Sequence, residues 1–233
     1  MFCMNSLWIG KDKMDQLVKA AAAGGELRIF AAVTTDLVAE AMRRHDCWPV
    51  AAAALGRTMT GALLFAANLK NKESVTIKFK GDGPLGTVTA DATAEGYVRG
   101  YVDHPHVHLP LNAMGKIDVG GGIGRGLLSV TRFTGLKEPV TGSVHIVNGE
   151  IAEDLISYLY TSEQTPSSIG LGVLVSPELE CLGAGGFFVQ PMPGASGETL
   201  DRVEENLKTI SSVSQMAEAG LDAAGIIEKV FGG

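Results

Sequence analysis

Three histidines at alternate positions are the residues whose spacing most suggests metal chemistry. The run "DHPHVH" contains His104, His106 and His108. On a strand these imidazoles would share one face, and imidazole is a common ligand of transition metals. However, Pro105 weakens regular strand pairing, and no acidic cluster with matching spacing follows. The run keeps open a small-molecule hydrolase or transferase, but it favours a loop or edge segment that holds no metal.

A glycine-rich run raises a second chemistry, phosphate binding. The letters "GGGIGRG" cover residues 120–126, but neither GxGxxG nor GxxxxGK[ST] can be aligned with them. The run also lies between two strand-like segments, without the helix N-terminus whose free N–H groups bind phosphate. It is therefore predicted to be a flexible hairpin turn.

A third run, "SEQTPSS", contains serines that could act as nucleophiles, namely Ser162, Ser167 and Ser168. A catalytic serine needs a histidine base, a group that orients the base and an oxyanion hole. The chain has no G-x-S-x-G elbow. The residues before the run have an apolar helical stripe, and Pro166 disfavours helix at the preceding residue. The run is therefore interpreted as a helix stop that leads into a buried strand, and no catalytic residue is assigned.

Composition narrows the function classes further. The 233 residues carry a net charge of -7 and a pI near 5.2, without a cluster of Lys and Arg, which argues against a nucleic-acid partner. Cys3, Cys47 and Cys181 form no CxxC motif and no disulfide framework. Such cysteine usage is typical of a reducing, cytoplasmic compartment. The most apolar run, residues 50–69, has Arg57 in its interior, so it is expected to be a buried helix and not a membrane span.

Periodicity along the chain predicts an α+β fold, a mixed α/β core with antiparallel-rich sheets and packed helices. The residues before Met14 are expected to be a short extension. Helices are expected from Thr35 or Asp36, from Pro49 to about Leu69, and over residues 150–160. Strands are expected within the runs "ELRIFAAVTT", "SVTIKFKGDGPLGTVTADATAEGYVRGYV", "LLSVTRF", "PVTGSVHIV", "GLGVLV" and "GGFFVQ".

A helical tail follows the core. The run "QPMPGASG", residues 190–197, has the prolines and glycines of a linker. Beyond it the pattern is helical, with apolar side chains repeating along one face of each helix. The two stripes comprise Leu200, Val203, Leu207 and Ile210, and then Leu221, Ile226, Ile227 and Val230.

Several long blocks of the sequence resemble, in the same order, those of the redox-regulated heat-shock holdases, the thirty-three-kilodalton chaperonin family. The resemblance covers about Met14 to Gly233. Its blocks are "TTDLVAEAMRRHDCWPVAAAALGRTMTGALL", "GDGPLGTVTADA", "GYVRGYV", "GLKEPVTGSV", "GEIAEDLISYLYTSEQTPSSIGLGVLV" and "AGGFFVQPMPGA".

The resemblance implies an ATP-independent chaperone of the bacterial cytoplasm, and not an enzyme, that holds unfolding proteins during oxidative and heat stress. It implies a chaperone core over residues 14–190 and a helical linker region over residues 191–233. Unfolded client proteins would be the partners, and a homodimer through the linker region is a further expectation. The client-binding residues expected on the apolar linker faces are Leu200, Val203, Leu207, Ile210, Ile226, Ile227 and Val230.

The family also has a C-terminal domain in which four cysteines, in a CxC and a CxxC, hold zinc when reduced. Their oxidation releases the metal and destabilises the linker. None of the three cysteines of this sequence has that spacing. The zinc domain is therefore expected to be absent from this chain, and neither a metal site nor a cofactor is expected in it.

Overall fold

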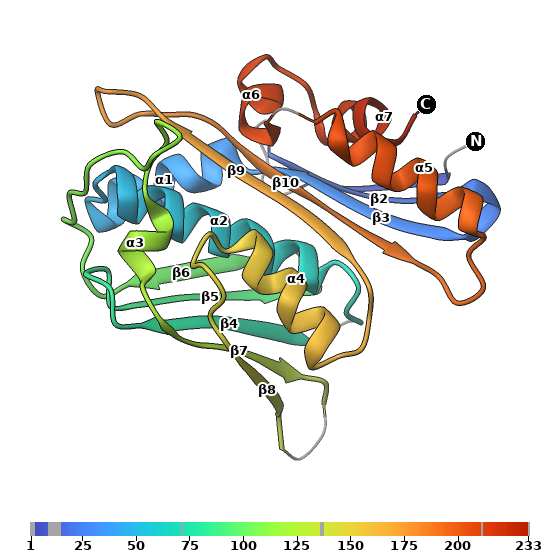
Figure 1. The fold of residues 1–233 in the computed structure, drawn as a ribbon, viewed down its shortest axis with the longest axis horizontal. Helices are drawn as coiled ribbons and strands as arrows, with labels where there is room; N and C mark the ends of the chain where they lie inside the picture. The colour runs from blue at the N-terminus through green and yellow to red at the C-terminus, as the bar shows by residue number, and fades with distance from the viewer. Residues whose placement is uncertain (1–2, 9–14, 71, 136–137, 211, 233) are drawn as a thin grey trace.

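The computed structural model describes residues 3–8, 15–70, 72–135, 138–210 and 212–232. Its strands form two five-stranded antiparallel sheets on either side of a layer of helices (Figure 1). In order across sheet A these are β1 (Cys3–Trp8), β2 (Gln16–Ala22), β3 (Leu27–Val33), β10 (Cys181–Pro191) and β9 (Ser168–Val175). In order across sheet B they are β6 (Val98–Val102), β5 (Thr87–Thr93), β4 (Ser74–Gly81), β7 (Gly126–Phe133) and β8 (Val140–His145).

The central helix α2 (Pro49–Ala66) packs between the two sheets, with α1 (Thr35–His45) and α4 (Ala152–Thr161) beside it. Sixteen of its 18 residues are buried, because small alanine side chains let it approach both sheets. It is long and apolar enough to cross a membrane by those two criteria alone, but 89% of it is buried inside the protein. The expectation of a buried core helix is therefore confirmed.

Sheet B covers α2 with one apolar face. In β4 the side chains of Val75, Ile77 and Phe79 are fully buried, while Thr76 between them is half-buried and Lys78 and Lys80 are exposed. This period of two is what a sheet with one face on the core requires. The expected strands and the expected α+β class are thus both found, and β9 and β10 form the expected hairpin.

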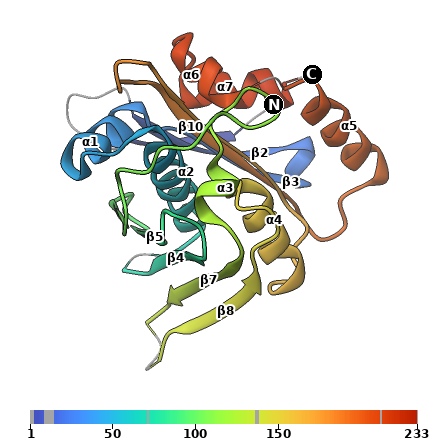
Figure 2. The same ribbon diagram turned by 60° about the vertical axis from the view of Figure 1, so that its left-hand side comes forward.

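The last three helices form an outer layer on the other face of sheet A (Figures 1 and 2). They are α5 (Gly197–Lys208), α6 (Val213–Glu218) and α7 (Ala223–Phe231). Because helices lie on both sides of β3, this strand is apolar on both faces, and Ile29, Phe30, Ala31 and Ala32 are all buried.

Two local expectations were incomplete or wrong. The segment before Met14 was expected to be only an extension, yet its residues 3–8 form β1, which pairs with β2 in register Cys3↔Ala21. The glycine run was expected to be a hairpin turn, but Val119–Ile123 is a helical turn, α3. The carboxylate of Asp118 caps it by accepting from Gly121 N at 2.9 Å.

Close packing against sheet B explains why α3 is rich in glycine. The N–H of Gly83 donates to the carbonyl of Ile123 at 2.9 Å, and that of Leu85 to the carbonyl of Gly122 at 3.0 Å. A Cβ on Gly122 of α3 would lie 2.9 Å from Leu85 Cδ1, and one on Gly81 of β4 would lie 1.8 Å from the Ile123 oxygen. Glycine is needed here for backbone contact and not for turn flexibility.

Candidate functional site

The histidine run lies in the loop after β6 and its three imidazoles are exposed. His106 Nε2 lies 2.8 Å from Asp46 Oδ2, and its ring lies 5.6 Å from that of Trp48. Within the described ranges, no three His, Cys, Asp or Glu side chains lie close enough together to hold a metal ion. The loop packs against the end of α1 and offers no assembled catalytic group.

The "SEQTPSS" run is a helix stop, as interpreted from the sequence. Helix α4 ends at Thr161, and the N–H of Thr165 donates to the carbonyl of Leu159 at 2.9 Å. Glu163 binds Arg132 of β7 at 2.8 Å and accepts from the Tyr158 hydroxyl at 3.0 Å. Burial, with the nearby Glu163 carboxylate, raises the pKa of Tyr158 to about 12. The run therefore fastens α4 to sheet B.

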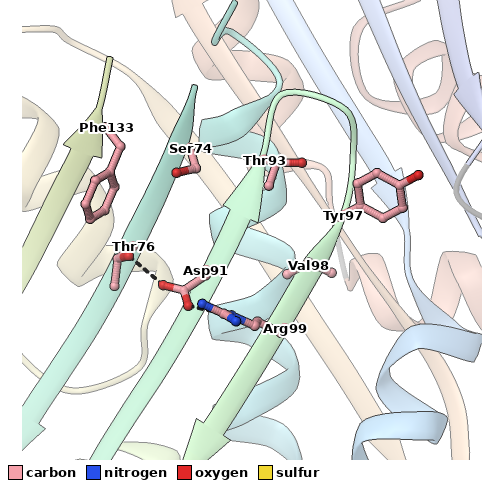
Figure 3. A pocket seen from close by; sticks show the side chains of 8 residues that line it. All are labelled: Ser74, Thr76, Asp91, Thr93, Tyr97, Val98, Arg99 and Phe133. Atoms are coloured by element: carbon pink, nitrogen blue, oxygen red, sulfur yellow. Dashed lines mark hydrogen bonds and ion pairs between the residues drawn. The ribbon is translucent and has the colours of Figure 1, made fainter. Parts of the chain in front are cut away.

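A shallow groove lies on the outer face of sheet B (Figure 3). It encloses about 650 Å³, and its polar centre is Asp91, which accepts from Thr76 Oγ1 at 2.5 Å and pairs with Arg99 Nε at 2.9 Å. Tyr97 and Phe133 lie at its sides and are exposed. The Asp91 carboxylate is already paired with Arg99, and the residues that line the groove include no histidine and no cysteine, so we assign no catalytic role to it.

The largest buried apolar contact outside the central core is between the tail helices and the outer face of sheet A, here called the tail interface. The sheet contributes alternate side chains of β2, β3 and β10, and the tail contributes one face of each helix. Its buried sheet residues are Val18, Ala20, Ala22, Leu27, Ile29, Ala31, Val33, Phe187 and Val189, and its buried helix residues are Val203, Val213, Ala223, Ile226, Ile227, Val230 and Phe231.

The seven residues expected to bind clients all belong to the tail helices or the turn that follows α5, and they differ in exposure. Ile226, Ile227 and Val230 are at most 1% exposed, and Val203 is 8% exposed. Leu207 and Ile210 are half-buried, and Leu200 is 37% exposed. The structure thus brings six of the seven into or against one apolar cluster. Their client-binding role stays a prediction, and most of them would become accessible only if the tail moved.

Glycines in the β9–β10 hairpin form the seat of α6, a feature that the sequence pattern did not reveal. A Cβ on Gly172 would lie 2.7 Å from Ser214 N, and one on Gly183 would lie 2.3 Å from Ser214 O. The α6 backbone therefore rests directly on the backbone of both strands. Only side-chain-free positions allow this approach.

The carboxylate of Glu26, which is far from α5 in sequence, holds the start of that helix. The sequence analysis did not predict this contact. Glu26 Oε2 accepts from Ser196 N at 3.2 Å, from Ser196 Oγ at 3.0 Å and from Thr199 Oγ1 at 2.5 Å. These hydrogen bonds, led by that of Thr199, lower the pKa of Glu26. The backbone carbonyl of Glu26 also accepts from Met192 N at 2.7 Å. We call this set of contacts the Glu26 clasp.

Comparison with known proteins identifies the family of this chain. The family described as "Hsp33 protein" matches residues 15–233. Proteins named 33 kDa chaperonin from Bacillus velezensis and Listeria innocua are 49% and 51% identical to it, over 94% of this chain and 76% and 75% of theirs. The chain belongs to the Hsp33 family. The crystal structure of the 33 kDa chaperonin from Thermotoga maritima has the same fold, with a TM-score of 0.88 and 38% identity over 94% of this chain and 76% of that one.

Membership of the Hsp33 family makes chaperone activity the function of this chain. It confirms the resemblance found in the sequence blocks and the α+β class. Nothing in the comparisons favours the alternative of a hydrolase or transferase built on the histidine loop.

Proposed function

We propose that the protein is an ATP-independent holdase that captures unfolding clients at the tail interface, without catalysing a reaction. The observation that carries the proposal is the apolar cluster between α5–α7 and the outer face of sheet A. Both sides of this contact are apolar, so release of the helices would present two binding surfaces at once. Binding by apolar burial is non-directional, which suits a chaperone that must accept many different clients.

The helices of the tail are amphipathic, and their buried side chains lie on the face that packs on the tail interface. Burying a side chain such as Ile226 or Val230 stabilises the closed form by roughly 1.5–3 kcal/mol. Few such side chains hold α5, in which only Val203 is buried. An element with so few buried contacts opens at lower free energy than the protein unfolds.

Zinc does not fit the residues that the structure describes. Burial raises the pKa of both Cys47 and Cys181 to about 11, which disfavours the thiolate form that binds metal. No other cluster of ligands accompanies them in the described ranges. We therefore assign no metal or cofactor to this chain, and zinc through four cysteines remains an implication of the resemblance for the full-length family.

The proposal also includes a homodimer as the assembly and the cytoplasm as the location. A second copy of the chain is a candidate partner, because exchange of the tail between protomers would rebuild the same apolar contact. Sedimentation at several concentrations tests this. The acidic composition and the scattered cysteines support a cytoplasmic protein that binds neither nucleic acid nor membrane.

The proposal is tested by light scattering of a client that aggregates on heating, without nucleotide. The reduced protein should suppress aggregation, and added ATP should change nothing. Two leucines with similar exposure provide a matched pair, Leu200 on α5 at 37% and Leu182 on β10 at 40%. Leu200→Asp should weaken suppression, whereas Leu182→Asp should not. An absolute need for ATP, or equal effects of the two substitutions, would contradict the proposal.

A further inference from the structure

We propose that Glu26 is a positioning residue that keeps α5 closed on the tail interface, and that α5 opens as an internal loop while α6 and α7 stay on sheet A. This inference rests on the proposed function, because it names the residue that controls access to that site. It concerns a contact between the β2–β3 connection and the hinge before α5, and it needs no metal, nucleotide or disulfide.

The geometry of the clasp shows why one side chain can control a helix. A single oxygen of Glu26 accepts three hydrogen bonds, from Ser196 N, Ser196 Oγ and Thr199 Oγ1. Ser196 is also the N-cap of α5, since its Oγ accepts from Thr199 N at 3.3 Å. The clasp therefore fixes both the cap and the first turn of the helix to the chain just before β3. Hydrogen bonds to a charged acceptor are stronger than those between neutral groups.

The other two tail helices are held differently. Helix α7 buries five of its nine residues and packs against β2 and β3. Helix α6 packs on β9 and β10 through the glycine seat at Gly172 and Gly183. By contrast, α5 packs mainly against α7 and buries only Val203. Most of its surface is exposed and acidic, including Glu198, Glu204 and Glu205.

The connections at both ends of α5 decide how it can open. On its N-terminal side α5 follows β10. That strand pairs with β3 as far as Pro191 and with β9 as far as Val189, which lies opposite Ser168. On the other side α5 leads into α6, which is seated on the hairpin. Opening therefore releases a closed loop whose two ends stay fixed. Because both ends are held, this local motion needs neither α6 nor α7 to leave the sheet. The entropic cost of keeping the two ends of such a loop together varies only slowly with its length.

Local opening would expose the apolar face of α5 and the part of α7 that it covers. Val203 and the half-buried Leu207 become accessible, and so does the α7 surface facing them. Clients would thus meet a partial binding surface while most of the tail interface is still closed. Removing the clasp should consequently increase chaperone activity and speed exchange in α5 alone, whereas a general loosening of the tail would also speed exchange in α6 and α7.

The test combines hydrogen exchange with the aggregation assay on the full chain. Glu26→Ala should speed amide exchange in α5 by about fivefold to tenfold, the size of effect that follows from losing a capping interaction. Exchange in α7 and β3 should not change, and suppression of aggregation should improve. Glu26→Gln, which keeps an acceptor oxygen without the charge, should give an intermediate result. Glu178→Ala, an exposed carboxylate on the β9–β10 turn, is the matched control and should behave as wild type.

A second variant guards against damage to the β2–β3 connection itself. Thr199→Val breaks the clasp from the helix side and should reproduce the faster α5 exchange. Unchanged α5 exchange in both variants would overturn the inference, and so would an equal increase in α6 and α7. Faster exchange confined to α5, without a gain in suppression, would support the clasp and contradict capture of clients at α5. The two claims therefore fail separately.

Discussion

Gly183→Ala tests whether the tail is seated as described, because it adds one methyl group and removes no contact. The new Cβ would lie 2.3 Å from Ser214 O and 2.7 Å from Glu218 N. Both atoms belong to the α6 backbone, so no side chain can rotate to relieve the clash. Since Cβ contacts below 3.0 Å essentially do not occur, the Ser214 carbonyl must retreat by at least about 0.7 Å.

Overpacking of this kind costs about 1–3 kcal/mol, which corresponds to about a 5-fold to 150-fold shift toward the open tail. The assay is amide exchange of α6 and α7 at neutral pH, together with suppression of client aggregation. Amide exchange of α6 and α7 and suppression of client aggregation should all increase, while amide exchange of α2 and sheet B should not change. Gly197→Ala is the control, because a Cβ there meets nothing within 4 Å. Unchanged α6 exchange in Gly183→Ala would show that α6 does not rest on this hairpin, and the description of the tail would be wrong.

Three further predictions concern the tail and its control. Leu207→Asp should loosen the tail and raise binding of an apolar dye, because the half-buried leucine packs against the tail cluster; unchanged dye binding and unchanged protease resistance at residues 190–197 would count against it. Peroxide should not alter suppression, because burial raises the pKa of Cys47 and Cys181 to about 11 and protonated thiols oxidise slowly; suppression that appears only after oxidation would reveal a cysteine switch. The folded-state pKa of Glu26 lies below its unfolded value, so the clasp is fully stabilising above about pH 4.5 and is lost as pH falls through the lowered pKa. Exchange of α5 relative to the intrinsic amide exchange rate at each pH should therefore rise as the pH falls over that range in wild type, and a similar rise in Glu26→Gln would refute the assignment.

Much of the fold could be predicted because its elements are locally consistent. The alternation of Val75, Ile77 and Phe79 with polar residues specifies a strand with one face on the core. Helix α2 could be predicted from its apolar, alanine-rich composition and from Pro49 at its first turn. The amphipathic stripes of the tail likewise predicted the faces that the structure buries, as Ile226 and Ile227 show.

The features that hold the tail in place could not be predicted, because each depends on residues that are distant in sequence. Nothing near Glu26 indicates that its carboxylate will meet Ser196 and Thr199. In the glycine seat, Gly183 contacts the backbone of α6, a helix that begins 30 residues later at Val213. Helix α3 was mistaken for a turn because the need for glycine arises from its close approach to Gly81, which no local pattern records.

The central claim, capture of clients at the tail interface, is tested most directly by site-specific photo-crosslinking. A photoreactive side chain placed at Leu207, on the inner face of α5, samples the tail interface. The same group at Phe133 samples the outer face of sheet B, where that side chain is 43% exposed. During aggregation of a heated client, position 207 should cross-link to the client and position 133 should not. Cross-links from position 133 alone would place the client on sheet B and contradict the account.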